Sequence, residues 1–296
     1  MLVLAACTPR RVPAPAPLVA PTPASETRET TLANGFISVR LDIPPGGPAR
    51  KPVVLSPIEV HRQEFVDAGI IMAWHRVNWE VLAPLVPPKP TEPVAPAEQQ
   101  GPSVGAWLLA APNPKTVGEA YFGLIEHEAV KVLPTVIDYL WTVPEVDTTR
   151  IAIEGSSTTG FIALEAVASD ERLTAAVVGS ACGDYFTFLH FSNLAMGGKP
   201  LDLDRTYSRR LAAEEPIARP RRLTHAALLT LNGAQDLAVP VACAQRTTRI
   251  LRAAYRRAGV PDRFRAVVYP DHGHNLGPEA LAEAAAWWAR WLGAGH

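Results

Sequence analysis

The chain has 296 residues, 48% of them hydrophobic and 19% charged, and its net charge is -1 at pH 7. These proportions exclude a disordered protein and fit one globular domain with a sizeable core. The 28 basic side chains are balanced by 29 acidic ones, which excludes the positive field that a nucleic-acid partner would need.

The amino-terminal residues are expected to lie outside the globular domain. Residues 4–7, with the sequence LAAC, resemble the lipobox of bacterial lipoproteins, in which a cysteine after small residues is lipidated. The apolar run before Cys7 is shorter than the ~7–15 residues of a signal-peptide core. Either the true start therefore lies upstream of Met1, or the match is chance. Residues 8–30 are rich in proline and alanine and predict an extended tether.

This division predicts a leader and tether at residues 1–30 and a single domain at residues 31–296. The chain is expected in the cell envelope, anchored by lipid on Cys7 or free in the periplasm, and in the cytoplasm if the match is chance. Lipid on Cys7 is the only membrane contact predicted, because no apolar run of ~18 residues follows. In an oxidising compartment Cys182 and Cys243 can pair, and two buried free thiols are the alternative.

Strands and helices are expected to alternate from the start of the domain. Strands are predicted at residues 35–43, 51–57 and 69–75, with a short helix at 59–68. Residues 84–102 are rich in proline without apolar periodicity, and they predict an exposed loop or insertion that could act as a lid.

The carboxy-terminal half continues the alternation. A long helix with a kink at Pro134 is expected first, and residues 181–222 are expected to be irregular and to form a cap. The other predicted elements are strands at residues 150–155, 173–180, 226–233 and 264–269, and helices at 117–141, 161–169, 241–258 and 278–292. Such alternation predicts an α/β fold with a mostly parallel sheet covered by helices on both faces.

Residues 155–160, with the sequence GSSTTG, lie between a predicted strand and a predicted helix. They resemble the nucleophile elbow of the α/β-hydrolase superfamily, Gly-x-Ser-x-Gly, in which the serine occupies a strained turn between small neighbours. Gly155 and Ser157 match the pattern, whereas Thr159 replaces the second glycine and Gly160 follows it. A helix cap without chemistry is the alternative interpretation of these residues.

The resemblance implies that an acid and then a histidine follow the serine along the chain. A serine hydroxyl needs a base, and the base needs an acid that orients it. Asp236 follows the strand expected to end at Gly233, and His274 lies between the last strand and the last helix. His272 competes for the role of the base, but the family segment usually ends in Gly-His. The reserve acids are Asp184, Asp262 and Asp271.

An oxyanion site is also implied by the resemblance, because the attacked carbonyl oxygen needs N–H donors. One donor is the backbone N–H of Thr158, directly after the nucleophile. The other belongs to the loop after Leu55, where Pro57 has no N–H and Ile58 is therefore expected to donate.

The sequence is similar to the dienelactone-hydrolase-like and prolyl-oligopeptidase-like branches of the superfamily. This implies a serine hydrolase that cleaves a carboxylic ester through an acyl-enzyme. Two alternatives stay open, a peptidase of acylaminoacyl or dipeptidyl type and a non-catalytic binding protein of the same fold. The expected partner is a small-molecule ester or a short peptide, without cofactor or metal, and the oligomeric state is undetermined.

Overall fold

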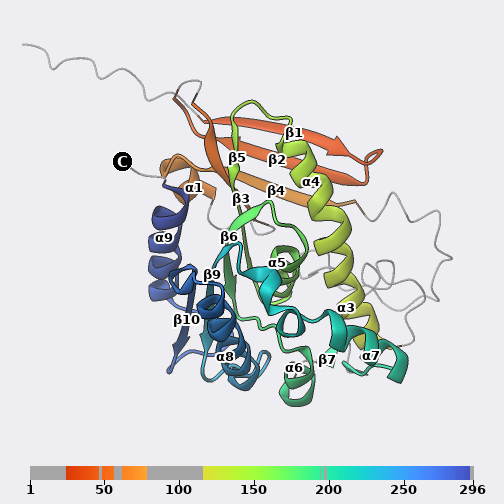
Figure 1. The fold of residues 1–296 in the computed structure, drawn as a ribbon. Coiled ribbons are helices and arrows are strands. Elements are labelled where there is room, and N and C mark those ends of the chain that lie inside the picture. Colours follow the sequence, from red (N-terminus) through yellow and green to blue (C-terminus); the bar gives the residue numbers. More distant parts are fainter. Residues whose placement is uncertain are drawn as a thin grey trace, which may run out of the picture.

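An eight-stranded sheet runs through the molecule (Figure 1). The computed structural model describes residues 25–46, 49–56, 62–78, 116–193, 195–196 and 199–293. The strand order is β1-β2-β4-β3-β5-β6-β9-β10, and all neighbours are parallel except β1 with β2 and β2 with β4. The strands are β1 (Glu26–Leu32), β2 (Ile37–Ile43), β3 (Lys51–Leu55), β4 (Ile71–Val77), β5 (Val146–Ser156), β6 (Leu173–Gly179), β9 (Ala227–Gly233) and β10 (Phe264–Tyr269).

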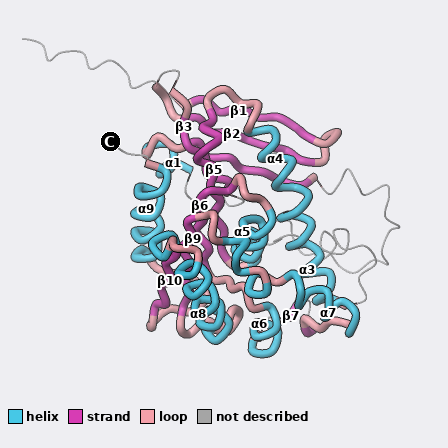
Figure 2. Tube along the Cα trace, in the orientation of Figure 1, coloured by secondary structure: helices cyan, strands magenta, loops and turns pink. Residues whose placement is uncertain are grey.

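Helices cover both faces of this sheet (Figure 2). Helices α1 and α9 pack on one face around a cluster that includes Phe65, Trp287 and Trp288. Helices α3, α4, α5 and α8 pack on the other face. The helices are α1 (Arg62–Asp67), α3 (Val117–His127), α4 (Leu133–Leu140), α5 (Thr158–Ser169), α6 (Tyr185–Phe191), α7 (Arg205–Glu214), α8 (Val241–Arg257) and α9 (Pro278–Leu292). The predicted α/β-hydrolase architecture, a mostly parallel sheet between two helical layers, is confirmed.

The sheet begins earlier than the sequence predicts. Strand β1 pairs antiparallel with β2 over its whole length, from Glu26 opposite Ile43 to Leu32 opposite Ile37. The prediction of a tether up to residue 30 is therefore wrong for its last five residues. No residue of β1 is buried, so the strand lacks the apolar alternation that reveals a strand in a sequence. Cys7 and the earlier part of the predicted tether lie outside the described residues.

The predicted long helix is present, with a π-helical turn at Glu128–Val132 between α3 and α4. Leu133 N–H donates to the carbonyl of Glu128, five residues earlier. Pro134 follows at once and has no N–H for the carbonyl four residues before it, so the regular helical pattern cannot continue unchanged. The irregularity predicted at Pro134 thus takes the form of a π turn. Glu128, the first residue of this turn, places its Oε2 atom 3.3 Å from His75 Nε2.

The prediction of an irregular segment at residues 181–222 is wrong. This segment contains α6 and α7. Asp184 and Asp204 precede them as N-caps, because each of these side chains accepts a backbone N–H of its helix. The segment also contains short 3-10 turns and a small hairpin, β7 (Ala195–Met196) with β8 (Lys199–Pro200). Its aromatic residues Tyr185 and Phe188 are buried in the core. The predicted cap therefore carries part of the domain's packing, whereas the predicted loop at 84–102 lies outside the described residues.

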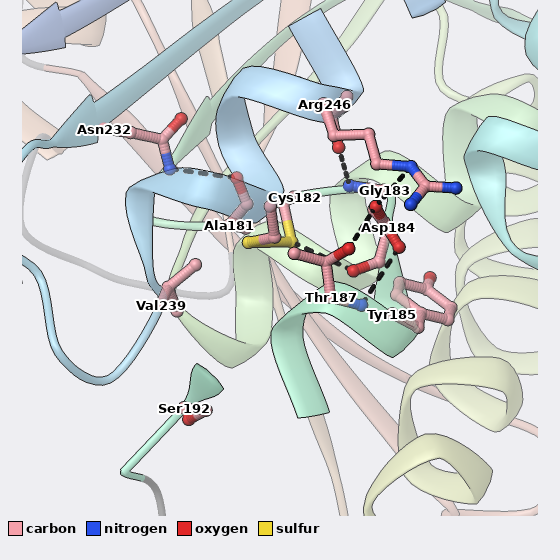
Figure 3. The surroundings of a disulfide bond; sticks show 12 residues. Ala181, Cys182, Gly183, Asp184, Tyr185, Thr187, Ser192, Asn232, Val239 and Arg246 are labelled. Atoms are coloured by element: carbon pink, nitrogen blue, oxygen red, sulfur yellow. Dashed lines mark hydrogen bonds and ion pairs between the residues drawn. A yellow bond between two sulfur atoms is a disulfide. The ribbon is translucent and has the colours of Figure 1, made fainter. Parts of the chain in front are cut away.

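Cys182 and Cys243 form a disulfide, with their Cα atoms 5.8 Å apart (Figure 3). The bond joins the loop after β6 to the first turn of α8, and both cysteines are buried. Next to it, Asn232 Nδ2 donates to the carbonyl of Ala181 at 3.0 Å. Of the two alternatives for these cysteines, the structure selects the disulfide.

None of the helices in the described residues is long and apolar enough to cross a bilayer.

Candidate active site

The structure brings the three predicted side chains together at the carboxyl end of the parallel strands. Ser157 follows β5, Asp236 follows β9 and His274 follows β10. Ser157 Oγ lies 2.9 Å from His274 Nε2, and His274 Nδ1 lies 2.8 Å from Asp236 Oδ2. An ionised carboxylate only accepts hydrogen bonds, so His274 carries its proton on Nδ1 and leaves Nε2 free to accept the proton of Ser157.

Ser157 occupies a strained turn. Its φ of 58° and ψ of -128° lie in a region that residues with a side chain rarely adopt. Its N–H donates to the carbonyl of Gly179 at 3.0 Å, and its carbonyl accepts the N–H of Phe161 at 3.1 Å. The turn is thus held on both sides, by β6 and by α5, and it presents the hydroxyl to His274.

Two glycines allow strand and helix to approach at this turn. A Cβ on Gly155 would overlap the backbone of Thr159, and a Cβ on Gly160 would lie 2.7 Å from the carbonyl oxygen of Gly179. Thr159 Oγ1 accepts the N–H of Ser156 at 2.9 Å and donates to its carbonyl at 2.8 Å. The departure of Thr159 from the family pattern is therefore compatible with the elbow, since its side chain bonds the turn and Gly160 makes the close approach.

Asp236 is held in place before it meets His274. Its side chain is fully buried, and Oδ1 accepts the N–H groups of Ala238 and Val239, each at 2.9 Å. These bonds leave Oδ2 directed at His274. The next residues lead into α8, whose first turn is attached to the loop after β6 by the disulfide at Cys243.

The loop that carries His274 has two supports that the sequence did not reveal. The hydroxyl of the buried Ser180, a residue with a φ of 44°, donates to the His274 carbonyl at 2.8 Å. His272 Nε2 lies 3.0 Å from Glu279 Oε1 in the first turn of α9. His272, the competing histidine, therefore contacts α9 and not Ser157. Ser180 carried no sequence signal, because an isolated serine after a strand is common.

Asp236 also changes the acidity of the histidine. Its hydrogen bond and negative charge raise the pKa of His274 above the ordinary value, and this effect exceeds the opposing effect of partial burial. The imidazolium that forms when His274 takes a proton is thus stabilised next to Ser157.

Thr158 is the first residue of α5, where backbone N–H groups have no partner within the helix. The side chains of Thr158 and the buried Tyr121 are hydrogen-bonded, which holds the start of α5. Thr158 thus lies at the elbow, and the role of its N–H as an oxyanion donor stays a prediction. Ile58, the other predicted donor, lies outside the described residues.

None of the three reserve acids takes the position of Asp236 beside His274. Asp184 Oδ2 accepts from Thr187 and lies 3.0 Å from Arg246 Nε (Figure 3), and Asp262 pairs with Arg290. Asp271 lies exposed in the loop before His274. In the described ranges, no three side chains of His, Cys, Asp or Glu are grouped closely enough to hold a metal ion.

A cavity of about 530 Å³ opens beside these residues, and we call it the α1–α9 cavity. It lies between α1, α9 and the ends of β5, β6 and β9, and His274 is part of its lining. Most of its wall is apolar, with Phe65, Val177, Leu231 and Trp288 among the lining residues. Its volume is in the range of small-molecule sites.

Residues 128–295 match the sequence profile of the prolyl oligopeptidase family. The match starts in the π-helical turn and includes Ser157, Asp236 and His274. No curated protein sequence matches the chain.

Solved structures with the same fold cover nearly all of the chain. The Mycobacterium tuberculosis puromycin-hydrolyzing peptidase has a TM-score of 0.62 and 15% identity over 95% of this chain and 41% of its own. The Pyrococcus horikoshii acylaminoacyl peptidase has a TM-score of 0.64 and 14% identity, over 91% of this chain and 42% of its own. A Klebsiella pneumoniae protein assigned to the dienelactone hydrolases has a TM-score of 0.57 and 16% identity, over 92% of this chain and 99% of its own.

The chain thus spans less than half the length of the two peptidases and almost the whole length of the third protein. At these identities the likeness concerns the fold. The family profile covers more than half of the chain, and the topology of the sheet agrees with it. The chain therefore belongs to the prolyl oligopeptidase family, a branch of the serine hydrolases with the α/β-hydrolase fold.

Proposed function

We propose that this chain is a serine hydrolase in which Ser157 is the nucleophile, His274 the base and Asp236 the acid that orients the base. The observation that carries the proposal is the pair of hydrogen bonds that joins them, 2.9 Å from Ser157 Oγ to His274 Nε2 and 2.8 Å from His274 Nδ1 to Asp236 Oδ2. Near neutral pH a serine hydroxyl is a weak nucleophile without such a base.

The proposed reaction has two halves and uses neither a cofactor nor a metal. Ser157 Oγ attacks the carbonyl carbon while His274 Nε2 takes its proton, and the carbonyl oxygen becomes an oxyanion that accepts the N–H of Thr158 and of Ile58. The bond to the leaving group then breaks, and the leaving group takes the proton from His274. In the second half His274 deprotonates a water molecule that attacks the acyl-enzyme, which releases the acid and restores Ser157.

The proposed substrate is a small carboxylic ester. A peptidase of acylaminoacyl or dipeptidyl type is the second candidate, and the family match together with the two peptidases of similar fold favours it to the same degree. Both substrates pass through the same acyl-enzyme, so the mechanism does not depend on the choice.

A fluorophosphonate probe tests the mechanism, because it reacts only with an activated serine. We expect covalent labelling of the wild-type chain, mapped to Ser157 by mass spectrometry, and no labelling of Ser157→Ala. Ser156→Ala is the matched control, since it removes the neighbouring hydroxyl and should still be labelled. An unlabelled but folded wild type would support the third alternative, a binding protein without catalysis.

The choice of substrate needs a separate experiment. Nitrophenyl esters of increasing acyl length should be hydrolysed faster than aminoacyl anilides if the chain is an esterase. Turnover of the anilides without turnover of the esters would replace the esterase proposal by the peptidase.

We further propose that the chain works in an oxidising compartment of the cell envelope. The disulfide between Cys182 and Cys243 supports this location, because such bonds are rare in the reducing cytosol. Lipid on Cys7 remains a proposal for how the chain is held there. Rapid alkylation of intact cells should leave both cysteines unmodified, and two alkylated cysteines would place the chain in a reducing compartment.

The same disulfide has an expected effect on stability. It closes a loop of 61 residues, for which the chain-entropy model gives about 4 kcal/mol. The double variant Cys182→Ala with Cys243→Ala should therefore melt roughly 10 °C lower in a calorimetric scan. Reduction of the wild type should produce a similar loss and reduction of the double variant none, and equal melting temperatures for all samples would contradict the prediction.

A further inference from the structure

The α1–α9 cavity contains a carboxyl group that the proposed mechanism does not use. Alternate side chains of β5 face opposite sides of the sheet, and Ala152 belongs to the cluster on the α1 and α9 side. Glu154, two residues later, faces the same side and lines the cavity. The hydroxyl of the buried Ser56 donates to Glu154 Oε1 at 2.7 Å. Glu154 is thus held by one oxygen, and its side chain borders an open space.

A second carboxyl group makes the cavity more negative. Glu64 of α1 lines it as well and lies exposed at its rim. The surrounding apolar side chains and the charge of Glu64 raise the pKa of Glu154 to about 7. Of the described residues that line the cavity, none is a lysine or an arginine. Among these residues the ionised form of Glu154 therefore has no cationic partner, and a ligand with a positive charge would supply one.

The position of Glu154 limits where that charge is attached. Glu154 precedes Ser157 by three residues, and at ~3.3 Å per residue their Cα atoms are about 10 Å apart. This spacing favours a cation that is separated from the scissile carbonyl by several bonds. A cation at the end of a chain of several methylene groups fits, because apolar side chains such as Val177 and Leu231 line the space.

We propose that the α1–α9 cavity binds the acyl part of the substrate, an aliphatic chain that ends in an ammonium group, and that Glu154 selects this group. The inference rests on the proposed function, since it assumes acyl transfer to Ser157. His274 lines the same cavity, so a bound chain lies next to the reacting groups. Glu64 adds a weaker attraction, because its carboxylate is exposed and screened by water.

Two isosteric esters test the selection, p-nitrophenyl 6-aminohexanoate and p-nitrophenyl heptanoate, which differ by an ammonium in place of a methyl group. At pH 8 the wild type should have a kcat/KM for the charged ester roughly 10- to 100-fold above that for the neutral one, the range of a charge-assisted hydrogen bond. Glu154→Gln keeps the size of the side chain and an acceptor for Ser56. It should bring this ratio close to one, because the variant has no carboxylate that could favour the charged ester.

The control for a general charge effect is Glu171→Gln. Glu171 is exposed in the turn before β6, at the opposite end of the strands, so this variant should keep the wild-type ratio.

Leu281→Lys is a second test of the ammonium preference if Glu154→Gln does not fold. Leu281 lines the cavity and is 51% exposed, and a lysine there offers its own ammonium to Glu154 and should remove the preference.

A wild-type ratio near one, with normal turnover of heptanoate and normal fluorophosphonate labelling, would overturn this inference and leave the proposed function intact. A preference that persists unchanged in a folded Glu154→Gln or Leu281→Lys variant would also overturn it. Loss of labelling and of all ester turnover in the wild type would instead refute the proposed function, and the inference with it.

Discussion

Replacement of His274 by alanine is expected to lower kcat about 10⁶-fold, the loss found when the base of a serine hydrolase is removed. The reason is that Ser157 Oγ has its 2.9 Å hydrogen bond to His274 Nε2 and keeps its proton when this acceptor is absent. The remaining activity should come from the oxyanion site and substrate binding alone. Steady-state turnover of a nitrophenyl ester, with active-site titration of the wild type, measures the effect.

His272→Ala is the matched control for this prediction. Its ring contacts Glu279 at the start of α9, so its removal loosens the loop without removing a group that contacts Ser157. A loss of roughly ten-fold or less is expected, the scale of one exposed interaction. A larger loss for His272→Ala than for His274→Ala would mean that the two histidines exchange their roles during turnover, contrary to the geometry.

Asp236→Asn has the second largest expected effect, a fall in kcat of about 10⁴-fold. The asparagine amide preserves the size of the side chain but can donate a hydrogen bond toward His274 Nδ1. That bond favours the tautomer with its proton on Nε2, which cannot accept the proton of Ser157. Fluorophosphonate labelling should be slowed to a similar extent, because it depends on the same activation.

The pH dependence gives this prediction a second readout. His274 acts as a base only when it is neutral, so kcat/KM rises as the pH passes its pKa. Asp236 raises this pKa, and the rise should therefore move to lower pH in Asp236→Asn. Heptanoate is the substrate for both profiles, since a neutral ester responds least to the ionisation of Glu154. An unchanged midpoint would show that Asp236 does not contact His274 in solution.

Asp184→Asn is the matched control for Asp236→Asn. Asp184 is an equally buried carboxylate, but it caps α6 and pairs with Arg246. Its replacement should lower the melting temperature and leave the pH midpoint of hydrolysis in place. A shift of that midpoint would indicate that any buried negative charge near α8 acts on His274.

Much of the fold was predictable because apolar side chains repeat along strands and helices that bury one face. Strands β5, β6, β9 and β10 follow such runs, and the helix Pro278–Leu292 agrees with its prediction at both ends. The pattern fails where a segment has no face to bury, as in β1, or where polar side chains cap short helices, as at Asp184 and Asp204. The backbone of β1 depends on its pairing with β2, whereas the two caps are local but consist of single aspartates that apolar periodicity does not detect.

For the site, the sequence by itself determined the order of the reactive residues and their places after β5, β9 and β10, because the ends of parallel strands meet at one edge of the sheet. Only the tertiary structure decided that His274 and not His272 reaches Ser157, that Cys182 and Cys243 pair, and that Glu154 borders a cavity. The physical reason is that each of these facts depends on a distance of a few ångströms between segments far apart in the chain. Residue type and spacing limit such distances, and the packing of the helices on the sheet sets them.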